Sequence, residues 1–206
     1  MRQDLEITID IANLGDSTGI HNILKKNLIE IRDIEKITRK QRKDLEDKGF
    51  LRKEVGIEYY KNLINDPFTD IYIAKNNDGI IVGFATIYRK KYTIIKVRDI
   101  IGNLSFENEK TKDLLLNEES EFTYLDQISV FPEYKRKGIG TTIFQKALKT
   151  INTPIVAFIV EKPLFNKVSI YWHENNGFEF SGISGGKYKG KPFKFQIFIN
   201  WNQKEH

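Results

Sequence analysis

A short turn rich in glycine and basic residues offers the clearest chemistry in this sequence. Lys135, Arg136 and Lys137 come directly before Gly138-Ile139-Gly140, and a helical pattern of apolar residues follows. Glycines at the start of a helix let several backbone N–H groups converge on a ligand, because no Cβ atom obstructs them. The same N–H groups have no partner within the helix, and the helix dipole favours an anion beside them. The turn therefore predicts an anion site.

Two well-known phosphate-binding patterns do not match this turn. The P-loop pattern G-x-x-x-x-G-K-[ST] does not occur, and the dinucleotide pattern G-x-G-x-x-G would need glycine where Ile143 stands. Tight packing of the turn against the following helix would also explain a Gly-Ile-Gly sequence. The surrounding residues have to decide between binding and packing.

A strand and a helix are predicted on either side of the turn. Residues 122–130 form a β-rich run that Pro132 closes. From Ile139 to Ile151, apolar residues recur at helical spacing with polar residues between them. A strand, a glycine-rich turn and an amphipathic helix therefore lie at the centre of the expected structure.

The rest of the chain alternates between strand and helix patterns. Residues 34–64 are rich in charge, and we expect one helix there that ends near Pro67. The sequence Asn76-Asn77-Asp78-Gly79 predicts the turn of a hairpin. The remaining expected elements are strands over 5–11, 70–75, 80–88, 155–160, 178–183 and 193–201, and helices over 17–33 and 166–176, the last ended by Gly177.

Residues 97–119 carry many charged side chains around Leu114-Leu115-Leu116. One interpretation is a surface insertion with one short helix. The other is a flap over a substrate site. The pattern does not choose between them.

Residues on both sides of the turn form two longer motifs. The pattern Val130-x-Pro132-x-x-Lys135-x-x-Gly138-x-Gly140 resembles motif A of the GNAT family of N-acetyltransferases. Downstream, at the correct distance, Asn166-x-x-Ser169-x-x-x-His173-x-x-x-Gly177-Phe178 resembles the second block of that family. The resemblance covers residues 122–183 closely and residues 70–88 less specifically. The first 65 residues match only as a strand followed by two helices.

The resemblance implies an α/β (α+β) fold. A mixed, mostly antiparallel central β-sheet would be flanked by helices, with the strand, glycine-rich turn and helix at its centre. One acyltransferase domain would span residues 1–206. Residues 1–65 would form an N-terminal strand and helices, and residues 66–206 the sheet, the CoA-binding core and a C-terminal hairpin.

The resemblance also implies acetyl-CoA as the acyl donor. In the family, amides of the turn hold the pyrophosphate of CoA. The strand before the turn bulges and splays from its neighbour, so that pantetheine pairs with it. One N–H group of that strand would stabilise the oxyanion of the tetrahedral intermediate. The residues expected to bind the donor are Ile128, Ser129, Val130, Lys135, Arg136, Lys137, Gly138, Ile139, Gly140, Thr141 and Asn166.

Two positions depart from the family pattern. Lys135 stands where Arg or Gln is usual, which should leave binding intact because the backbone holds the pyrophosphate. His173 stands where the family has tyrosine, and an imidazole that titrates near neutrality can protonate the departing thiolate. Alternatively, His173 only forms hydrogen bonds at the end of its helix. Tyr171 or Trp172 could replace it as the acid, or both could pack in the core.

A base must remove a proton from the incoming ammonium. Asp126, in the middle of the strand before the turn, is the first choice. Without a bulge it would share a strand face with Tyr124 and Ile128. The alternative is a structural carboxylate, and Glu161 is a weaker candidate for the base.

The expected reaction transfers an acetyl group directly from acetyl-CoA to a primary amine of a small molecule or protein. The sequence has no cysteine, so a Cys-linked acyl-enzyme is excluded. The alternative is a catalytically silent domain that binds acyl-CoA as a sensor or interaction module. The acceptor itself cannot be recognised from the sequence.

Composition limits the other classes of function. The 33 basic and 28 acidic residues give a net charge of +5 and a pI near 9.1, which suits anionic partners. We expect no nucleic acid, because no recognised nucleic-acid motif accompanies this charge. We expect no membrane partner, since no apolar run is long enough to cross one, and a cytoplasmic location. No metal site is expected, because the three histidines lack ligand spacing, and the sequence leaves room for a homo-oligomer.

Overall fold

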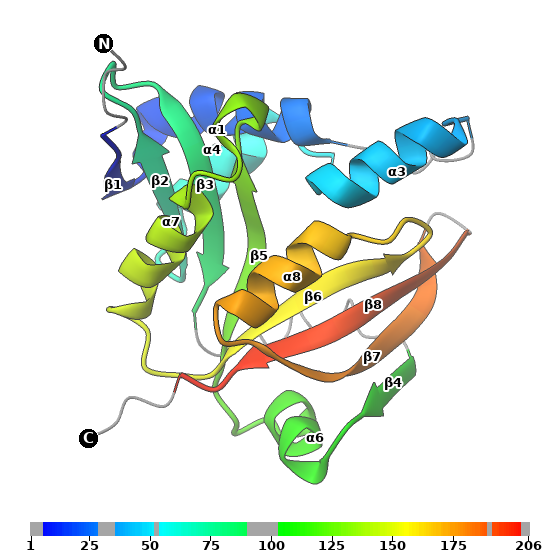
Figure 1. Cartoon of the computed structure of the whole chain (residues 1–206). Coiled ribbons are helices and arrows are strands. Elements are labelled where there is room, and N and C mark those ends of the chain that lie inside the picture. The colour runs from blue at the N-terminus through cyan, green and yellow to red at the C-terminus, as the bar shows by residue number, and fades with distance from the viewer. Residues whose placement is uncertain (1–5, 29–35, 52–53, 90–102, 189–190, 203–206) are drawn as a thin grey trace.

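The computed structural model describes residues 6–28, 36–51, 54–89, 103–188 and 191–202. Its strands are β1 (Thr8–Ile11), β2 (Thr69–Lys75), β3 (Ile81–Tyr88), β4 (Asn103–Phe106), β5 (Thr123–Val130), β6 (Ile155–Lys162), β7 (Glu179–Tyr188) and β8 (Lys191–Asn200). They form one sheet in the order β1-β2-β3-β5-β6-β8-β7-β4 (Figure 1). Neighbouring strands are antiparallel except β5 and β6, which are parallel. The expected mixed, mostly antiparallel sheet is confirmed.

Helices cover both faces of this sheet (Figure 1). Ile143 and Phe144 of α7 are buried against one face, and Ile20 and Tyr60 of α1 and α4 against the other. No helix in the described part of the chain has the length and apolar character needed to span a membrane. The helices are α1 (Ser17–Asn27), α3 (Arg39–Lys48), α4 (Ile57–Asn65), α6 (Glu109–Leu116), α7 (Ile139–Leu148) and α8 (Lys167–Asn175), with short 3-10 turns η1 (Leu14–Asp16) and η2 (Pro132–Tyr134).

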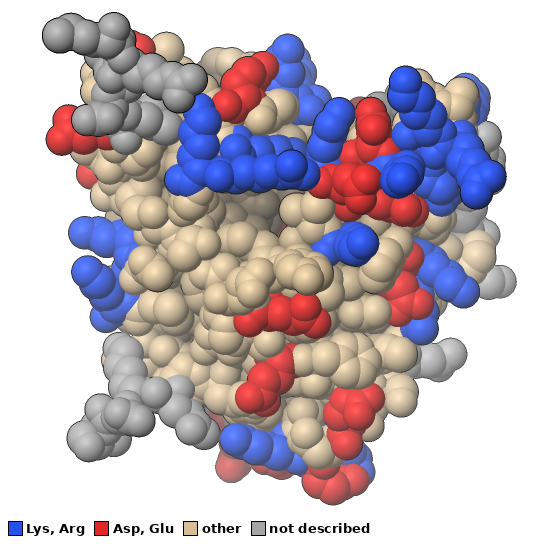
Figure 2. Space-filling model, viewed as in Figure 1, with Lys and Arg blue, Asp and Glu red and all other residues tan. Residues whose placement is uncertain are grey.

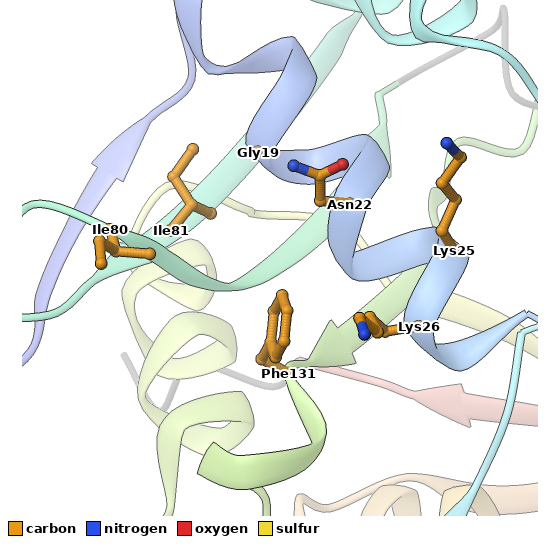
Figure 3. Close-up of a pocket in the computed structure, with 7 residues that line it drawn as sticks. All are labelled: Gly19, Asn22, Lys25, Lys26, Ile80, Ile81 and Phe131. Carbon is orange, nitrogen blue, oxygen red and sulfur yellow. The ribbon is translucent and has the colours of Figure 1, made fainter.

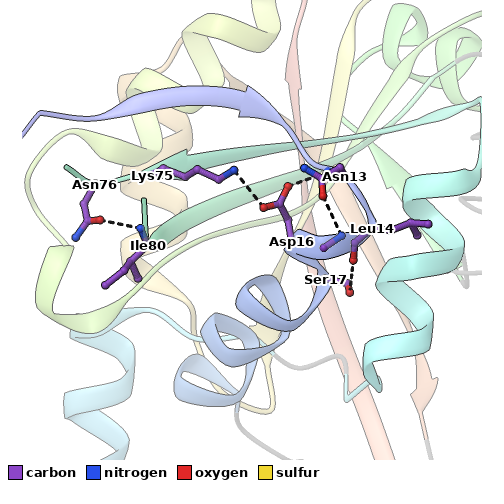
Figure 4. A network of polar contacts seen from close by, with 8 residues as sticks. Asn13, Leu14, Asp16, Ser17, Lys75, Asn76 and Ile80 are labelled. Atoms are coloured by element: carbon purple, nitrogen blue, oxygen red, sulfur yellow. Dashed lines mark hydrogen bonds and ion pairs between the residues drawn. The ribbon is translucent and has the colours of Figure 1, made fainter. Parts of the chain in front are cut away.

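A nearly buried carboxylate fixes the start of α1 on the sheet. Asp16 Oδ1 lies 3.2 Å from Lys75 Nζ of β2, and Asp16 Oδ2 accepts a hydrogen bond of 2.9 Å from the N–H of Asn13 (Figure 4). At the end of β2, the Asn76 side chain accepts a 2.9 Å hydrogen bond from the N–H of Ile80, which closes the expected hairpin turn. At the other end of α1, the side chain of Asn27 donates a hydrogen bond to the Val130 carbonyl at the end of β5.

The expected helix that ends near Pro67 is confirmed as α4, which ends at Asn65, but a second helix in the same stretch was not expected. The described residues there form two helices, α3 and α4. Helix α3 stops where Gly49 adopts a φ of 70°, a left-handed conformation that favours glycine. The chain then buries Phe50, which is 6% exposed and packs with Leu164 and Val160. Burial of this one aromatic side chain divides the charged stretch.

Several other elements end earlier or later than expected. Helix α1 stops at Asn27 because Leu28 is extended, with ψ at 134°, and residues 29–35 lie outside the described part. Helix α7 stops at Leu148, before Ile151. Strand β7 continues past residue 183 to Tyr188, because β8 pairs with it along its whole length.

Strand β5 contains a bulge in the middle of the sheet. Thr86 of β3 pairs with Gln127, but the next residue, Ile87, pairs with Leu125. Asp126 is therefore the extra residue on β5. Such a residue bends a strand and changes which face the following side chains occupy.

The described part of the 97–119 stretch is built into the sheet. Strand β4 pairs with β7 and forms an edge of the sheet. Helix α6 buries Leu114 and Leu115 in the same core as α1 and α4. This arrangement corresponds to an insertion with one short helix, and residues 97–102 lie outside the described part.

Candidate functional site

Strands β5 and β6 run side by side for only two residue pairs. Thr123 pairs with Ile155 and Tyr124 with Val156. Beyond these pairs, β5 continues beside β3 and β6 continues beside β8, so the two parallel strands diverge (Figure 1). We call the side of β5 that faces this divergence, from the bulge to Val130, the open edge. The bulge and the splay implied by the motif are both present.

The peptide groups of Ile128 and Val130 face the open edge. The N–H of Phe131 donates to the carbonyl of Val82 on β3 at 2.7 Å. Peptide groups of an antiparallel strand alternate between the partner and the opposite side, so those of Ile128 and Val130 point away from β3. The Val130 carbonyl accepts a 3.1 Å hydrogen bond from the side chain of Asn27. The N–H groups of Ile128 and Val130 are those that can pair with an extended ligand.

The turn after β5 passes twice through left-handed conformations. Arg136 has a φ of 61° and Gly138 a φ of 77°. Gly138 caps α7, and the N–H of Thr142 donates to its carbonyl at 2.9 Å. The N–H groups of residues 139–141 therefore precede the first bond within the helix. Since glycine has no side chain to cap them, these donors are available to an anion.

The two glycines of the turn differ in how strongly the structure requires glycine at each position. A Cβ atom at Gly140 would lie 3.4 Å from Nε1 of Trp172 and 3.8 Å from Cδ1 of Ile128. A Cβ atom at Gly138 would meet nothing within 4 Å, so its left-handed φ is what favours glycine there. A Cβ atom at Gly140 would therefore make only ordinary van der Waals contacts, so packing of α7 on α8 does not require glycine there. At Gly138 the left-handed backbone does favour glycine.

The ammonium group of Lys135 is turned toward the protein. It donates hydrogen bonds to the carbonyl oxygens of Lys48 at 2.9 Å and Gly49 at 3.4 Å, where α3 ends. A helix C-terminus favours a cation. Burial, followed by the nearby Lys48 charge, lowers the pKa of Lys135. Lys135 therefore joins the turn to the C-terminal end of α3.

The other two basic residues of the turn face solvent. Arg136 and Lys137 are exposed, and the Lys137 ammonium lies 5.0 Å from the ring centre of Tyr134. Figure 2 shows basic side chains gathered along the upper part of this face, where Figure 1 places α3 and the start of α7. These charges supply a positive field at the turn.

A segment that sequence reasoning missed, residues 48–51, links the turn to α8. Besides the contact with Lys135, it accepts a hydrogen bond at the Phe50 carbonyl from the Asn166 side chain, 3.0 Å away. The N–H of Leu51 donates to the carbonyl of Asn27 at 2.8 Å. Asn166 also caps α8 through Ser169 and is 8% exposed. In this structure, Asn166 therefore holds the segment in place.

His173 lies on the buried side of α8 and is 3% exposed. Its Nδ1 donates to the Ser169 carbonyl at 2.7 Å. The centre of its ring lies 4.8 Å from the ring centre of Trp172 and 4.8 Å from that of Phe178. Burial lowers the pKa of His173 to about 4, although the bond to Ser169 raises it. The ring is therefore neutral at pH 7, unlike the imidazole titrating near neutrality that the sequence suggested.

Tyr171 and Trp172 point in different directions. Tyr171 is 64% exposed, so the interpretation that it packs in the core is wrong. Trp172 does pack there, with its ring 5.5 Å from that of Phe144 on α7. The helical spacing of 100° per residue explains the difference between neighbours. Tyr171 keeps an accessible hydroxyl.

The bulge turns Asp126 toward α4. The Tyr59 hydroxyl donates to Asp126 Oδ2 at 3.4 Å, and the next strand residue, Gln127, also faces α4. Ile128 packs on the opposite face, with the core of α7. Of the two neighbours expected for an unbulged strand, Tyr124 shares the face of Asp126 and Ile128 does not.

Glu161 is held in an ion pair. Its carboxylate lies 2.8 Å from Lys194 Nζ and accepts a 3.2 Å hydrogen bond from Gln196. Burial raises the pKa of Glu161, but the bonds from Lys194 and Gln196 outweigh it and leave the pKa lowered. A carboxylate stabilised in its charged form is a weak base.

A model of the acetyltransferase (GNAT) family matches residues 31–178, well over half of the chain. The chain belongs to the GNAT acetyltransferase family. The match contains the turn, the open edge and α8. A comparison with curated protein sequences finds no match.

Solved GNAT structures share this fold. The ribosomal-protein-S18-alanine N-acetyltransferase of Escherichia coli superposes with a TM-score of 0.60 at 12% identity, covering 98% of this chain and 97% of that one. NAA60 of Arabidopsis thaliana in complex with acetyl-CoA gives 0.58 at 15% identity, covering 95% and 99%. PaiA of Thermoplasma acidophilum in complex with coenzyme A gives 0.53 at 15% identity, covering 93% and 98%. At these identities the common feature is the fold.

A pocket of about 380 Å³ lies between α1, the start of β3 and Phe131, outside the open edge (Figure 3). Its apolar part comes from the start of β3 and from Phe131, the residue after β5, and its basic part comes from α1. None of the residues expected to bind the donor lines it. The lining residues are Gly19, Asn22, Lys25, Lys26, Ile80, Ile81 and Phe131.

Proposed function

We propose that this protein is an N-acetyltransferase that moves an acetyl group from acetyl-CoA to a primary amine. The observation that carries the proposal is the open edge of β5, which leads directly into the left-handed start of α7 at Gly138. Membership of the GNAT family supports acetyl transfer. Two of the superposed structures contain acetyl-CoA or coenzyme A, which supports acetyl-CoA as the donor.

The turn suits the pyrophosphate of CoA. The N–H groups of residues 139–141 and the dipole of α7 provide the backbone part of the site. Arg136 and Lys137 add exposed positive charge. Lys135 acts indirectly, since its ammonium group is held on the carbonyl oxygens of residues 48 and 49. We therefore propose binding mainly through the backbone.

The open edge suits an extended chain with amide groups, such as pantetheine. Ile128 and Val130 present outward N–H groups. We propose that the N–H of Val130 donates to a carbonyl oxygen of pantetheine, and that the N–H of Ile128, next to the bulge, donates to the thioester oxygen that becomes the oxyanion of the tetrahedral intermediate. Such a donor typically contributes about 10²–10³ in rate.

We assign the general base to Asp126. A proton passes from the acceptor ammonium to the Asp126 carboxylate, so that an N–H bond breaks and an O–H bond forms. The lone pair on nitrogen then forms a C–N bond at the thioester carbon. When the intermediate collapses, the C–S bond breaks and its electron pair goes to sulfur, while the nitrogen releases its second proton to solvent and becomes a neutral amide. Since Asp126 and Ile128 are two residues apart on one strand, base and oxyanion donor are positioned together.

The leaving sulfur then takes up a proton, and α8 offers two candidates for its donor. His173 is neutral at pH 7, so it would have to release the proton that it shares with the Ser169 carbonyl. Tyr171 has an accessible hydroxyl. We therefore prefer Tyr171 as the donor and assign His173 to packing of the helix.

Thiol release from acetyl-CoA with a panel of primary amines tests the function. We expect amine-dependent release of CoA thiol, together with a product that mass spectrometry finds heavier by one acetyl group. Calorimetry with CoA alone provides the second measurement. Binding of CoA without thiol release for any amine, peptides with a free N-terminus included, would contradict the proposal and identify a binding module.

A further inference from the structure

A chain of hydroxyl groups leads to the Asp126 carboxylate. The Tyr59 hydroxyl donates to Asp126 Oδ2 at 3.4 Å, and the Tyr88 hydroxyl lies 2.7 Å from that of Tyr59. One of these two hydroxyls donates to the other, and the hydroxyl of Tyr124 also donates a hydrogen bond to the Asp126 carboxylate. Helix α4, strand β3 and strand β5 thus each contribute one residue to the chain Tyr88–Tyr59–Asp126.

Aromatic rings surround the inner side of this carboxylate. The rings of Tyr88 and Tyr124 are stacked with their centres 6.0 Å apart, and the two side chains are only 1% and 5% exposed. Tyr59 and Asp126 are half-buried. The more accessible pair therefore forms the opening, and the two buried rings form the wall behind it.

The cluster carries one negative charge and neutral rings. Burial, and then the negative charge of Asp126, raise the pKa of Tyr88 and of Tyr124 far above the usual range. These hydroxyls therefore stay protonated at working pH. A carboxylate next to electron-rich ring faces attracts a cation both as an ion pair and through cation–π contact.

We propose that Tyr59, Tyr88, Tyr124 and Asp126, the acceptor cluster, recognise a primary ammonium on an unbranched alkyl chain. The inference rests on the proposed function and names the acceptor class of that site. Asp126 supplies the counter-charge, and Tyr59 is a positioning residue that orients the carboxylate. The carbon next to the α-amino group of a peptide has two substituents, whereas that of an unbranched chain has one, so the unbranched chain brings less bulk against the two nearly buried rings.

The acceptor cluster lies at the inner end of the open edge. Tyr124 forms the last residue pair between β5 and β6, with Val156. Asp126 is the bulge residue between that pair and the outward N–H of Ile128. An ammonium group at Asp126 is therefore delivered two residues from the N–H assigned to the oxyanion.

The test measures binding of 1,4-diaminobutane by calorimetry, without acetyl-CoA, to the full chain and its variants. Tyr59→Phe removes the hydroxyl that bonds to Asp126. Tyr60→Phe makes the same change at the next position of α4, where the hydroxyl donates to Gln127 Oε1 at 2.9 Å. We expect binding at least about tenfold weaker for Tyr59→Phe, and within about twofold of wild type for Tyr60→Phe. Circular dichroism checks that both variants are folded.

Two further measurements do not depend on the fate of one variant. Asp126→Asn keeps the shape of the side chain and should abolish diamine binding. In turnover assays, Tyr59→Phe should raise the KM for the diamine about tenfold and lower kcat, because Asp126 is also the assigned base, while the KM for acetyl-CoA changes little. A structural defect would raise the KM for both substrates.

The outcomes separate this inference from the proposed function. Equal weakening by Tyr59→Phe and Tyr60→Phe would overturn the inference, as would absence of diamine binding by the wild-type protein. Tighter binding of a peptide through its free N-terminus than of the diamine would overturn the unbranched class. If the wild-type protein binds the diamine but never releases thiol from acetyl-CoA, the proposed function fails and the acceptor cluster remains a cation site.

Discussion

The ammonium nitrogen of Lys135 lies 2.9 Å from the carbonyl oxygen of Lys48. This bond joins the turn of motif A to the end of α3, 87 residues earlier in the chain. Lys135, which stands where the family usually has Arg or Gln, thus bonds to the protein backbone. The charge at position 135 therefore acts on the shape of the turn.

Lys135→Ala should reduce stability more than donor binding. Loss of a charged hydrogen bond should lower the free energy of unfolding by about 1–2 kcal/mol, while CoA affinity falls less than about tenfold. Lys137→Ala is the control, since it removes an exposed charge of the same turn and should leave stability within about 0.5 kcal/mol. Urea unfolding and calorimetry provide the two measurements. A hundredfold, salt-insensitive loss of CoA affinity in Lys135→Ala would instead make Lys135 a direct ligand.

Gly138→Asp should weaken CoA by at least about tenfold, because it adds a negative charge where the pyrophosphate is expected. The matched control is Gly79→Asp. Gly79 has a φ of 74°, close to the 77° of Gly138, and a Cβ atom there also meets nothing within 4 Å. Both variants therefore carry the same backbone strain and charge, but only Gly138→Asp lies at the turn before α7. Equal CoA affinity in the two variants would remove the anion site from Gly138.

The stability of the protein should depend on pH through His173. Its pKa falls from about 6.5 in the unfolded chain to about 4 in the folded one, so the folded state resists protonation. The free energy of unfolding should therefore be highest above pH 6.5 and should fall by on the order of 3 kcal/mol as the pH falls toward 4. His173→Phe should remove this part of the slope. Urea unfolding of both proteins from pH 7.5 to 4 measures the difference, and parallel curves would show that His173 is not buried as a neutral ring.

Turnover of His173→Phe separates packing from catalysis. With Tyr171 as the donor, we expect His173→Phe to keep kcat within about tenfold at pH 8 and Tyr171→Phe to lose about 10²–10⁴. The reverse pattern, with CoA affinity unchanged in both variants, would return the donor role to His173. Steady-state kinetics at saturating acetyl-CoA provide the comparison.

Donor binding should protect the open edge from hydrogen exchange. The amides of Ile128 and Val130 should exchange more slowly when acetyl-CoA is bound, because the thioester oxygen and pantetheine would accept hydrogen bonds from them. The amides of Ile71 and Ile73 in β2, which lie between β1 and β3, serve as the internal control. Equal protection of both sets would indicate general stabilisation of the fold and would leave the open edge without a ligand.

Local signals made the centre of the molecule predictable. The glycines of the turn, the cap residue Asn166 and the left-handed Gly177 each belong to a pattern that a few neighbouring residues determine. The hairpin at Asn76–Gly79 was predictable for the same reason. These signals were enough to indicate the family and the position of the glycine-rich turn.

Features that depend on distant pairing were not predictable. The resemblance implied a bulge in the strand before the turn, but only the register with β3 shows that Asp126 is the extra residue. The burial of His173 arises from the packing of α8 on the sheet. The buried position of Phe50 did leave a trace in the sequence, since Gly49-Phe50-Leu51 interrupts a highly charged stretch. An apolar pair after glycine in a highly charged stretch indicates a segment that packs into the core.

The two residue pairs between β5 and β6 have a mechanical consequence. They divide the eight strands into two leaves of four, β1-β2-β3-β5 and β6-β8-β7-β4, joined along a short seam at Thr123–Ile155 and Tyr124–Val156. Each leaf is internally paired over many more residues than the seam. Shear between the leaves therefore meets the least backbone resistance along this line. A chain bound in the splay would lie across it, so the acyl donor would also act as a clasp between the leaves.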